Sequence, residues 1–556
     1  MSNNRRTNAT RKMPKKRRRI SPLLKFLCFI LSIAGIGLFG LFAYQFFMLN
    51  IVPNMILIPV LVVLVLITLL IIVFSNFKCR RNISKFLMVL ILVLINVVYG
   101  FGNYYVYGMT KLFDKVTNLT EKTTHKINVL TDAESGLTKL SDLDDCVLGT
   151  VSSLDPKGTK KCLQDIKKKI DVQTVEYTSV EELVWALFND QVDGIIMNES
   201  YEGGIHETYY DFGVQVNRVH TTVYYTDRSQ SQSESLNKVK NITSDPFTIL
   251  ISGNDSYGEI GTNGRSDVNM LVTVNPNTHT ILLTSIPRDY YVPMACSAQE
   301  DGCPQDQPDK LTHTGLYGVE TTDKTIEELL DIEINYTVQV NFSSLVNIVD
   351  SVGGIDVYVE DGLEVDVFAA NGSKGVTAGM NHLDGERALA FSRERYAYQD
   401  GDLQRVKNQQ IVIQALIEKI ASPSMLMNFG KFVDAVGSAF ATNMPADQIR
   451  TFIQYQFALM PKWNFESFAL VGKDGNEFSP SIGLNAAVLL PYEEYVEEAS
   501  DKIKAVLDGD SSNDIDTIPD NLDRLTVRTY DSSQDAFYED QTNEIYDPVY
   551  DGYSYY

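Results

Sequence analysis

The chain has 556 residues, of which 21% are charged, and its formal net charge is −23 at pH 7. The first 110 residues hold 14 Lys and Arg and no Asp or Glu, so the other 34 basic residues face all 71 acidic ones, a formal charge of −37. So acidic a surface repels nucleic acid and argues against DNA or RNA binding by this part of the chain.

A basic segment at the N-terminus precedes three long apolar runs. The runs cover residues 23–49, 51–77 and 83–107. Each exceeds the ~20 residues that a helix needs to cross a bilayer, and together they are too long for a cleaved signal peptide. By the positive-inside rule, the tail 1–22 and the link Lys78–Arg81 are cytoplasmic. Three crossings, or a re-entrant hairpin and one crossing, then place everything after Gly108 outside the cell.

Four of the six cysteines follow the apolar runs as two local pairs, Cys146/Cys162 and Cys296/Cys303. Local pairing in an oxidising compartment suggests disulfides, and free buried cysteines are an equally good interpretation. The spacing of Cys and His residues does not indicate a zinc site.

Residues 111–230 predict a small α/β accessory domain. Strands are expected at 146–151, 172–177 and 192–197, and helices at 158–170 and 180–188. The second helix starts with a capping box, Ser179 to Glu182, and its Trp185 is expected in the core. This domain shows no catalytic constellation.

Residues 245–500 predict a second, larger α/β domain, and the acidic, Tyr-rich chain from about residue 509 is expected to be disordered. Strands 268–274 and 280–286 are joined by a tight turn and should pair antiparallel. Arg265 and Asp267 precede the first arm and Arg288 follows the second, so the hairpin should bring these side chains together. Asp255 follows another strand, 247–253, and Asp289 is expected to pair with a neighbouring arginine.

Further basic residues follow in the second half of this domain. A helix at 384–391 leads into Arg393 and Arg395, which we expect on one side of an extended segment. Asp402 is the expected N-cap of a helix through Ile420, with Arg405 and Gln409 on one face near its positive end. Lys310, in the segment DKLTH, adds another charge.

Arginine binds phosphate oxygens in a fork, and carboxylates attract a hard divalent cation. A single arginine–aspartate pair is usually only a surface ion pair, but repetition at strand ends and at a helix start favours a pyrophosphate site. The apolar residues of 326–334 and 345–352 are expected in the core, or lining a cavity for a lipid.

Several ordered motifs in residues 247–420 resemble the LytR-CpsA-Psr family of Gram-positive bacteria. The matching segments are GRSDVNMLVTVNPNTHTILLTSIPRD, DKLTHTGLYG, VNFSSLVNIVDSVGGIDVYV, GMNHLDGERALAFSRER and DGDLQRVKNQQIVI. The three spans and the accessory domain resemble the capsule-associated CpsA branch. The resemblance implies an extracellular α/β/α domain whose central mixed sheet and helices surround a polyprenyl pocket.

The resemblance also implies transfer of a glycopolymer, capsular polysaccharide by the domain layout, from a polyprenyl-pyrophosphate carrier to peptidoglycan with Mg²⁺. Teichoic acid or another wall polysaccharide is the alternative cargo. The implied pyrophosphate ligands are Arg265, Arg288, Lys310, Arg393, Arg395, Arg405 and Gln409. Asp255 and Asp267 would hold the metal, and one of them could accept the proton of the attacking sugar hydroxyl. Many family members have arginine where this chain has Asn408.

Two other functions would use the same arginines. One is a non-catalytic regulator or scaffold that binds lipid-linked glycan and contacts other polysaccharide-assembly proteins. The other is a hydrolase of the lipid-linked pyrophosphate, with water in place of the sugar hydroxyl.

Overall fold

The computed structural model describes residues 21–49, 51–79, 81–116, 122–209, 212–227, 238–254, 263–296, 302–399, 401–422, 425, 432, 440–519 and 524–530. Asp255 therefore lies outside the described residues. The chain divides into two compact units, residues 1–111 and 112–556.

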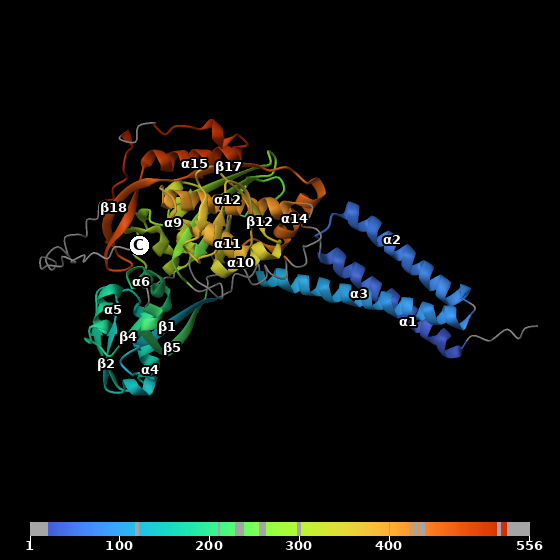
Figure 1. The fold of residues 1–556 in the computed structure, drawn as a ribbon, viewed down its shortest axis with the longest axis horizontal. Helices are drawn as coiled ribbons and strands as arrows, with labels where there is room; N and C mark the ends of the chain where they lie inside the picture. The colour runs from blue at the N-terminus through green and yellow to red at the C-terminus, as the bar shows by residue number, and fades with distance from the viewer. Residues whose placement is uncertain are drawn as a thin grey trace, which may run out of the picture. The chain divides into compact units, whose positions relative to one another are not determined.

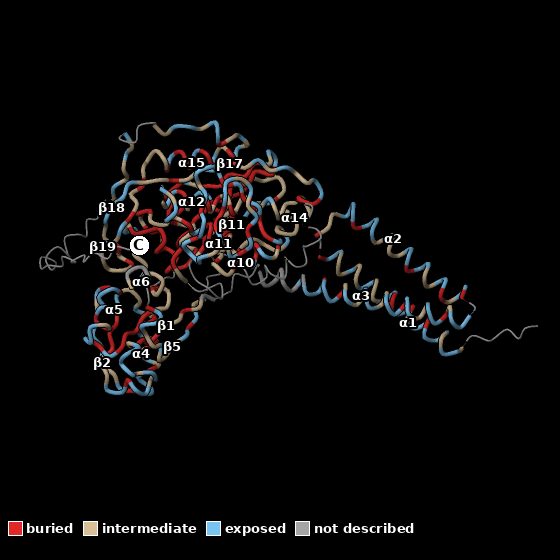
Figure 2. The backbone as a smooth tube through the Cα atoms, in the orientation of Figure 1, coloured by how far each residue is buried: buried red, intermediate tan, exposed pale blue. Residues whose placement is uncertain are grey.

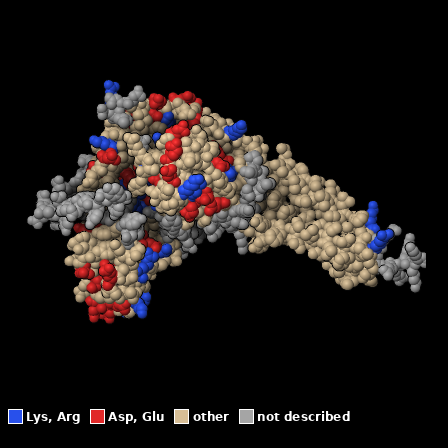
Figure 3. All heavy atoms as spheres, in the orientation of Figure 1, with Lys and Arg blue, Asp and Glu red and all other residues tan. Residues whose placement is uncertain are grey.

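The first unit consists of three long apolar helices (Figure 1). They are α1 (Pro22–Leu49), α2 (Asn54–Val73, continued by a π-helical turn Phe74–Lys78) and α3 (Asn82–Val116). All three are long and apolar enough to cross a membrane, as predicted. Their visible surface is almost uncharged, with Lys and Arg gathered at one end (Figure 3).

Asparagine side chains connect α1 with α3 inside this unit. Asn96 Nδ2 donates to the Leu31 carbonyl at 3.0 Å, and Asn103 Nδ2 donates to the Leu38 carbonyl at 2.9 Å. Amide groups that bond across helices are typical of helix packing in a bilayer, so these contacts suit neighbouring helices in lipid.

The second unit contains two large sheets among its described residues. The smaller, five-stranded sheet has the order β3-β2-β4-β1-β5. Its elements are β1 (Lys122–Asp132), β2 (Cys146–Thr150), α4 (Pro156–Ile166), β3 (Val172–Glu176), α5 (Val180–Phe188), β4 (Gly194–Asn198), α6 (Glu202–Thr208), α7 (Phe212–Gln215) and β5 (Val216–Asp227). The three strands and two helices expected here are present, and β1 and β5 were not predicted.

Two local predictions in α5 were wrong. Trp185 is 46% exposed, because α5 buries Val180, Leu183 and Leu187 on its other face. Ser179 does accept from the Glu182 N–H at 3.1 Å, but the Glu182 carboxylate accepts from Thr178 instead of completing a capping box.

The larger sheet has six strands in the order β16-β11-β6-β7-β8-β17. The strands are β6 (Phe247–Asn254), β7 (Ser266–Asn275), β8 (Thr280–Ile286), β11 (Tyr336–Asn341), β16 (Ala441–Thr442) and β17 (Asn464–Ala469). The sheet is mixed, since β11 and β17 run parallel to β6 and β8 while β7 is antiparallel to both its neighbours.

Helices cover both faces of this sheet. They are α9 (Val319–Leu330), α10 (Phe342–Ser351), α11 (Gly385–Arg393), α12 (Asp402–Ala421), α14 (Ala446–Leu459) and α15 (Glu493–Asp508). Leu250, Leu271 and Leu282 pack with α9 and α15 on one face. Phe247, Met270 and Leu283 on the other face pack with α12 and α14. The strands are accordingly the buried centre of the domain (Figure 2), which confirms the α/β/α fold.

Short ribbons surround these layers. They are β9 (Tyr291–Pro293), β10 (Pro308–Lys310), β12 (Ile355–Val359), β13 (Val365–Val367), β14 (Lys374–Val376), β15 (Gly379–Leu383), β18 (Gly472–Ser479) and β19 (Leu484–Pro491), with 3₁₀ turns at Leu140–Leu143, Glu199–Tyr201, Leu311–Tyr317 and Ser512–Asp514.

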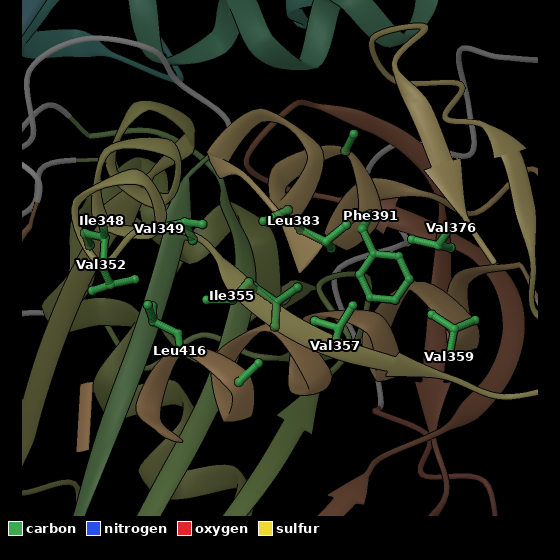
Figure 4. Packing of buried hydrophobic residues seen from close by; sticks show 14 of the residues in the cluster. Ile348, Val349, Val352, Ile355, Val357, Val359, Val376, Leu383, Phe391 and Leu416 are labelled. Atoms are coloured by element: carbon green, nitrogen blue, oxygen red, sulfur yellow. The ribbon is translucent and has the colours of Figure 1, made fainter. Parts of the chain in front are cut away.

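The two apolar stripes considered for a lipid cavity belong to different core clusters. Ile326, Leu329 and Leu330 pack with α15. Ile348 and Val349 pack with residues of α11, α12, β12 and β15 (Figure 4). The lipid pocket stays a prediction.

The expected start of the disordered tail needed correction, and the structure decides between the two interpretations of each cysteine pair. Residues 509–519 are ordered, with the Ser512 N–H donating to the Glu466 carboxylate at 2.7 Å, so the predicted start of the tail is too early. Cys296 and Cys303 form a disulfide, whereas Cys146 and Cys162 are free thiols. Burial raises the pKa of Cys162 to about 11, so this thiol stays protonated.

Candidate functional site

The predicted hairpin is formed by β7 and β8, with Asn269 opposite Ile286. The start of β7 therefore shares a sheet edge with the end of β8. The ends of β6 and β11 lie at the same edge, because these strands run parallel to each other and antiparallel to β7. Loops at the carboxyl ends of strands are the usual position of ligand sites in α/β domains.

Arg288 and Asp267 meet at this edge, as the hairpin predicts. Arg288 Nη1 lies 3.0 Å from Asp267 Oδ1, and Arg288 Nε lies 3.5 Å from Asp289 Oδ2. Lys310 Nζ lies 2.6 Å from Asp289 Oδ1. Asp289 is thus the ion-pair partner that was expected, and Lys310 belongs to the same network.

Asp289 is held in its ionised form. Burial alone would raise the pKa of this carboxyl, but Arg288, Lys310 and Arg265 outweigh burial and hold its pKa below the ordinary value. Arg265, which is only 5% exposed, therefore lies close enough to act on the same carboxylate.

The segment DKLTH packs directly against the start of β7. A Cβ atom on Gly315 would lie 2.3 Å from the Gly264 carbonyl oxygen, so only glycine allows this approach. The approach places Thr312, whose Oγ1 donates to Asp267 Oδ1 at 3.0 Å and whose N–H donates to the Arg288 carbonyl at 2.8 Å. Thr312 was not among the predicted site residues, although it stands in a motif that we singled out.

A buried polar cluster anchors the same segment. Asp309 is fully buried and accepts from Ser479 Oγ at 2.5 Å and from the Ser481 N–H at 2.8 Å. His313 Nδ1 lies 2.8 Å from the same carboxylate. Burial would raise the pKa of Asp309, but His313, Ser479 and Ser481 together lower it. The neighbouring Lys310 is consequently held on a rigid turn.

Arg405 approaches this network from the first turn of α12. Its Nη2 lies 2.6 Å from Asp402 Oδ1. Burial lowers the pKa of Arg405. The charges of Asp402 and Asp267 raise this pKa and those of Arg288 and Arg395 lower it, and the net result is a pKa below the ordinary value. Arg405 Nε is buried and has no hydrogen-bond partner among the described residues. The N-cap of α12 is Gly401, so Asp402 is the first helical residue and not the cap that was predicted.

Arg393 and Arg395 do not lie on one extended segment. The helix α11 continues to Arg393, and the chain becomes extended only at Glu394. The Arg393 guanidinium lies 4.2 Å from the centre of the Phe342 ring, at the start of α10. Arg395 acts on Arg405 electrostatically and donates to the Tyr396 hydroxyl at 2.7 Å. Arg395 therefore lies within electrostatic range of Arg405, whereas Arg393 contacts Phe342.

Glu394 points into the protein between these two arginines. It is 1% exposed and accepts from the N–H groups of Ala369, Tyr396 and Ala397 at 2.8, 3.0 and 3.2 Å. This carboxylate therefore fixes the loop that carries Arg395.

Neighbouring residues of α12 fix the helix in place. Asn408 is buried and donates to the Phe391 carbonyl at 3.1 Å, so this side chain attaches α12 to α11. Gln410 Nε2 donates to the Phe468 carbonyl at 2.8 Å and to Ser285 Oγ at 3.0 Å. Gln409, which stands between these two residues in the sequence, is half-buried.

Replacing Gln410 by leucine is expected to lower the free energy of unfolding by roughly 2 kcal/mol, because buried groups on β8 and β17 lose their donor. Gln414→Leu is the matched control, since Gln414 donates to Glu418 at the exposed surface of the same helix. Thermal unfolding of the two variants measures the difference. Equal melting temperatures would contradict the anchoring role.

Asp267 is the one predicted metal ligand among the described residues. Its Oδ1 accepts from Arg288 and Thr312, which leaves Oδ2 for another ligand. The described ranges contain no group of three or more Cys, His, Asp or Glu that could hold a metal ion. A cation here would need oxygen atoms from a substrate, as is usual for Mg²⁺.

Comparisons with known proteins agree with the motifs. The model of the LytR_cpsA_psr family matches residues 210–481. Polyisoprenyl-teichoic acid–peptidoglycan teichoic acid transferase TagU of Bacillus mycoides is 34% identical over 257 residues, which are 46% of this chain and 79% of that protein. The transferase TagT of Bacillus subtilis, named for the same activity, is 36% identical over 206 residues, 36% of this chain and 61% of that one.

A solved structure titled as the LytR-CPS2A-psr family protein YwtF (TagT) with bound octaprenyl pyrophosphate lipid is also similar. It has 27% identity and a TM-score of 0.37, and covers 49% of this chain and 94% of that one. The family match and the extent of the TagU alignment settle the classification: this chain belongs to the LytR-CpsA-Psr family.

Proposed function

We propose that this protein transfers a glycopolymer from a polyprenyl-pyrophosphate carrier to peptidoglycan. The observation that carries the proposal is the network at one sheet edge, in which Arg288 pairs with Asp267 and Asp289, and Lys310 pairs with Asp289. Arg405 lies within electrostatic range of Arg288 and Asp267. The names of TagU and TagT, which describe transfer of a polyisoprenyl-linked polymer to peptidoglycan, support it.

The electrostatics of the site suit a diphosphate. Arg288, Arg405 and Lys310 are largely buried, and the pKa of Arg405 is lowered mainly by burial, with a further contribution from the charge of Arg288. Two adjacent phosphates would neutralise these cations and would accept from Arg405 Nε. Phosphoryl transfer depends mainly on such positioning and charge stabilisation.

The reaction follows from this placement. The hydroxyl oxygen of a peptidoglycan sugar attacks the phosphorus that carries the glycan, and a new P–O bond forms. The bond between that phosphorus and the bridging oxygen breaks, and the lipid monophosphate leaves with the electron pair. The carboxylate of Asp267, or that of Asp255, accepts the hydroxyl proton. The arginines and Lys310 stabilise the charge of the departing phosphate.

Magnesium is part of the proposal. Asp267 uses Oδ1 for its hydrogen bonds with Arg288 and Thr312, and its Oδ2 is a hard oxygen ligand beside the proposed diphosphate. Asp255 supplies a second carboxylate in the sequence. Asp255 and Asp267 would therefore hold the ion. When bound, Mg²⁺ would neutralise phosphate oxygens. We expect EDTA to lower transfer at least tenfold and added Mg²⁺ to restore it. Full activity after exhaustive chelation would contradict this part of the proposal.

The cargo and the orientation complete the proposal. We infer from three spans and a basic tail that the site lies outside the cell, on the same side of the membrane as the wall. The accessory domain favours capsular polysaccharide as the cargo, whereas the relatives are named for teichoic acid. Polysaccharide-assembly proteins in the same membrane are proposed partners.

A transfer assay separates this function from its alternatives. Polyprenyl-pyrophosphate glycan labelled in the sugar is incubated with the protein, Mg²⁺ and peptidoglycan fragments. Label in the fragments supports transfer. Release of free phospho-glycan alone would show a hydrolase, and tight binding without product would show a regulator or scaffold.

A further inference from the structure

The accessory sheet has a topological switch point between β2 and β4. The chain leaves β2 through α4 to reach β3, then leaves β3 through α5 to reach β4 on the other side of β2, and these strands are parallel. Ile196 packs with the α4 cluster, whereas Ile195 and Met197 pack with the α5 cluster. Since successive residues of a strand face opposite sides, α4 and α5 cover opposite faces.

Open α/β sheets bind ligands at the carboxyl ends of their strands. A groove of about 440 Å³ lies at the carboxyl ends of β2 and β3, beside the switch point and on the α4 face. Thr150 and Glu176, the last residues of β2 and β3, line it together with Ser152. Lys160, Gln164 and Lys167 line it from α4 and its C-terminal end. The volume is within the range of small-molecule sites.

The wall formed by the strand ends is already ordered by hydrogen bonds. Glu176 Oε2 accepts from Thr150 Oγ1 at 2.6 Å and from Ser152 Oγ at 2.5 Å. Both hydroxyls are thereby committed as donors, and their lone pairs remain for donors of a ligand. Such fixed acceptors suit the hydroxyl groups of a sugar.

The opposite wall is cationic. Neither Lys160 nor Lys167 forms an ion pair with any described residue, although this part of the chain carries a large excess of Asp and Glu. The two lysines are seven residues apart, about 10 Å along the helix, and so on nearly the same side. Lys and Arg also gather along one flank of this domain in Figure 3. Two unpaired ammonium groups at this spacing suit two anionic groups on successive units of a chain.

We propose that this groove binds an acidic segment of the glycopolymer, with sugar hydroxyls on Thr150 and Ser152 and carboxylate or phosphate groups on Lys160 and Lys167. The inference rests on the proposed function for the identity of the polymer. It assigns the accessory domain a role in selecting acidic over neutral glycans while the pyrophosphate is handled at the larger sheet.

The test measures binding of oligosaccharides to the full chain in detergent, without lipid donor or acceptor. Hyaluronan hexasaccharide is the acidic probe, maltohexaose the neutral one, and free glucuronate the monomer. We expect the hexasaccharide to bind at least tenfold more tightly than maltohexaose or glucuronate. Lys160→Glu with Lys167→Glu should remove this preference, and Gln164→Trp, which fills the groove without changing charge, should weaken binding.

Lys168→Glu is the matched control, because Lys168 lies beside the same helix but pairs with Asp165 and does not line the groove. It should bind the hexasaccharide like the unmodified protein. Equal affinity for both hexasaccharides, equal affinity for glucuronate, or equal losses in Lys168→Glu would each overturn the proposal. Because no transfer is needed, a failure of binding is distinguishable from a failure of the proposed enzymatic function.

Discussion

Replacing Arg288 by glutamine is expected to lower the rate of glycopolymer transfer by about 10²–10³-fold, the usual cost of losing one donor to a developing anion. Arg288 joins Asp267 to Asp289 and lies within the electrostatic range of Arg405. Glutamine can still donate to Asp267, so the change removes the charge and the guanidinium fork while a link to β7 is kept.

The assay is transfer of labelled glycan to peptidoglycan fragments, with thermal unfolding as the test of folding. Arg288→Lys keeps the charge without the guanidinium fork, so its transfer rate should lie between those of Arg288→Gln and the unmodified protein. Lys504→Ala, which breaks an exposed ion pair with Asp331, is the control and should transfer normally. Activity of Arg288→Gln within threefold of the unmodified protein would refute the role of this arginine.

Replacing Arg405 by methionine is expected to abolish transfer while the melting temperature stays the same or rises by a few degrees. The pKa of Arg405 is lowered by burial and by Arg288 and Arg395, so the folded state disfavours its charge. A base whose pKa falls on folding destabilises the protein at neutral pH, and methionine removes that cost while filling similar space.

Two melting experiments separate these effects. A polyprenyl pyrophosphate should raise the melting temperature of the unmodified protein and should raise that of Arg405→Met much less. A large loss of stability in the ligand-free variant would show that Arg405 is a structural ion-pair partner of Asp402. An equal ligand-induced rise in both proteins would show that Arg405 does not bind the diphosphate.

The sequence predicted the structure correctly where a feature depends on residues that are neighbours in the chain. The turn at residues 275–278 predicted that β7 and β8 pair, and this pairing alone places Asp267 beside Arg288. The three apolar helices and the start of α12 were also visible as composition and periodicity.

Contacts between distant segments could not be predicted in this way. Asp309 is held by Ser479, the last residue of β18, and by Ser481 in the turn after it, about 170 residues further along the chain, so no local pattern connects them. The helix α11 extends to Arg393 because the Glu394 N–H still donates to the Phe391 carbonyl. The Arg393 guanidinium therefore lies over the Phe342 ring and not beside Arg395 on an extended segment. Burial of Glu394 depends on the loop at Ala369, which is also remote in the sequence.

The most direct measurement is a structure of the full chain with a polyprenyl pyrophosphate bound. We predict both phosphates at the edge of the six-stranded sheet, within hydrogen-bonding distance of the guanidinium groups of Arg288 and Arg405 and the ammonium group of Lys310. A diphosphate bound on another face, with these three side chains still paired only to Asp267, Asp289 and Asp402, would contradict the account.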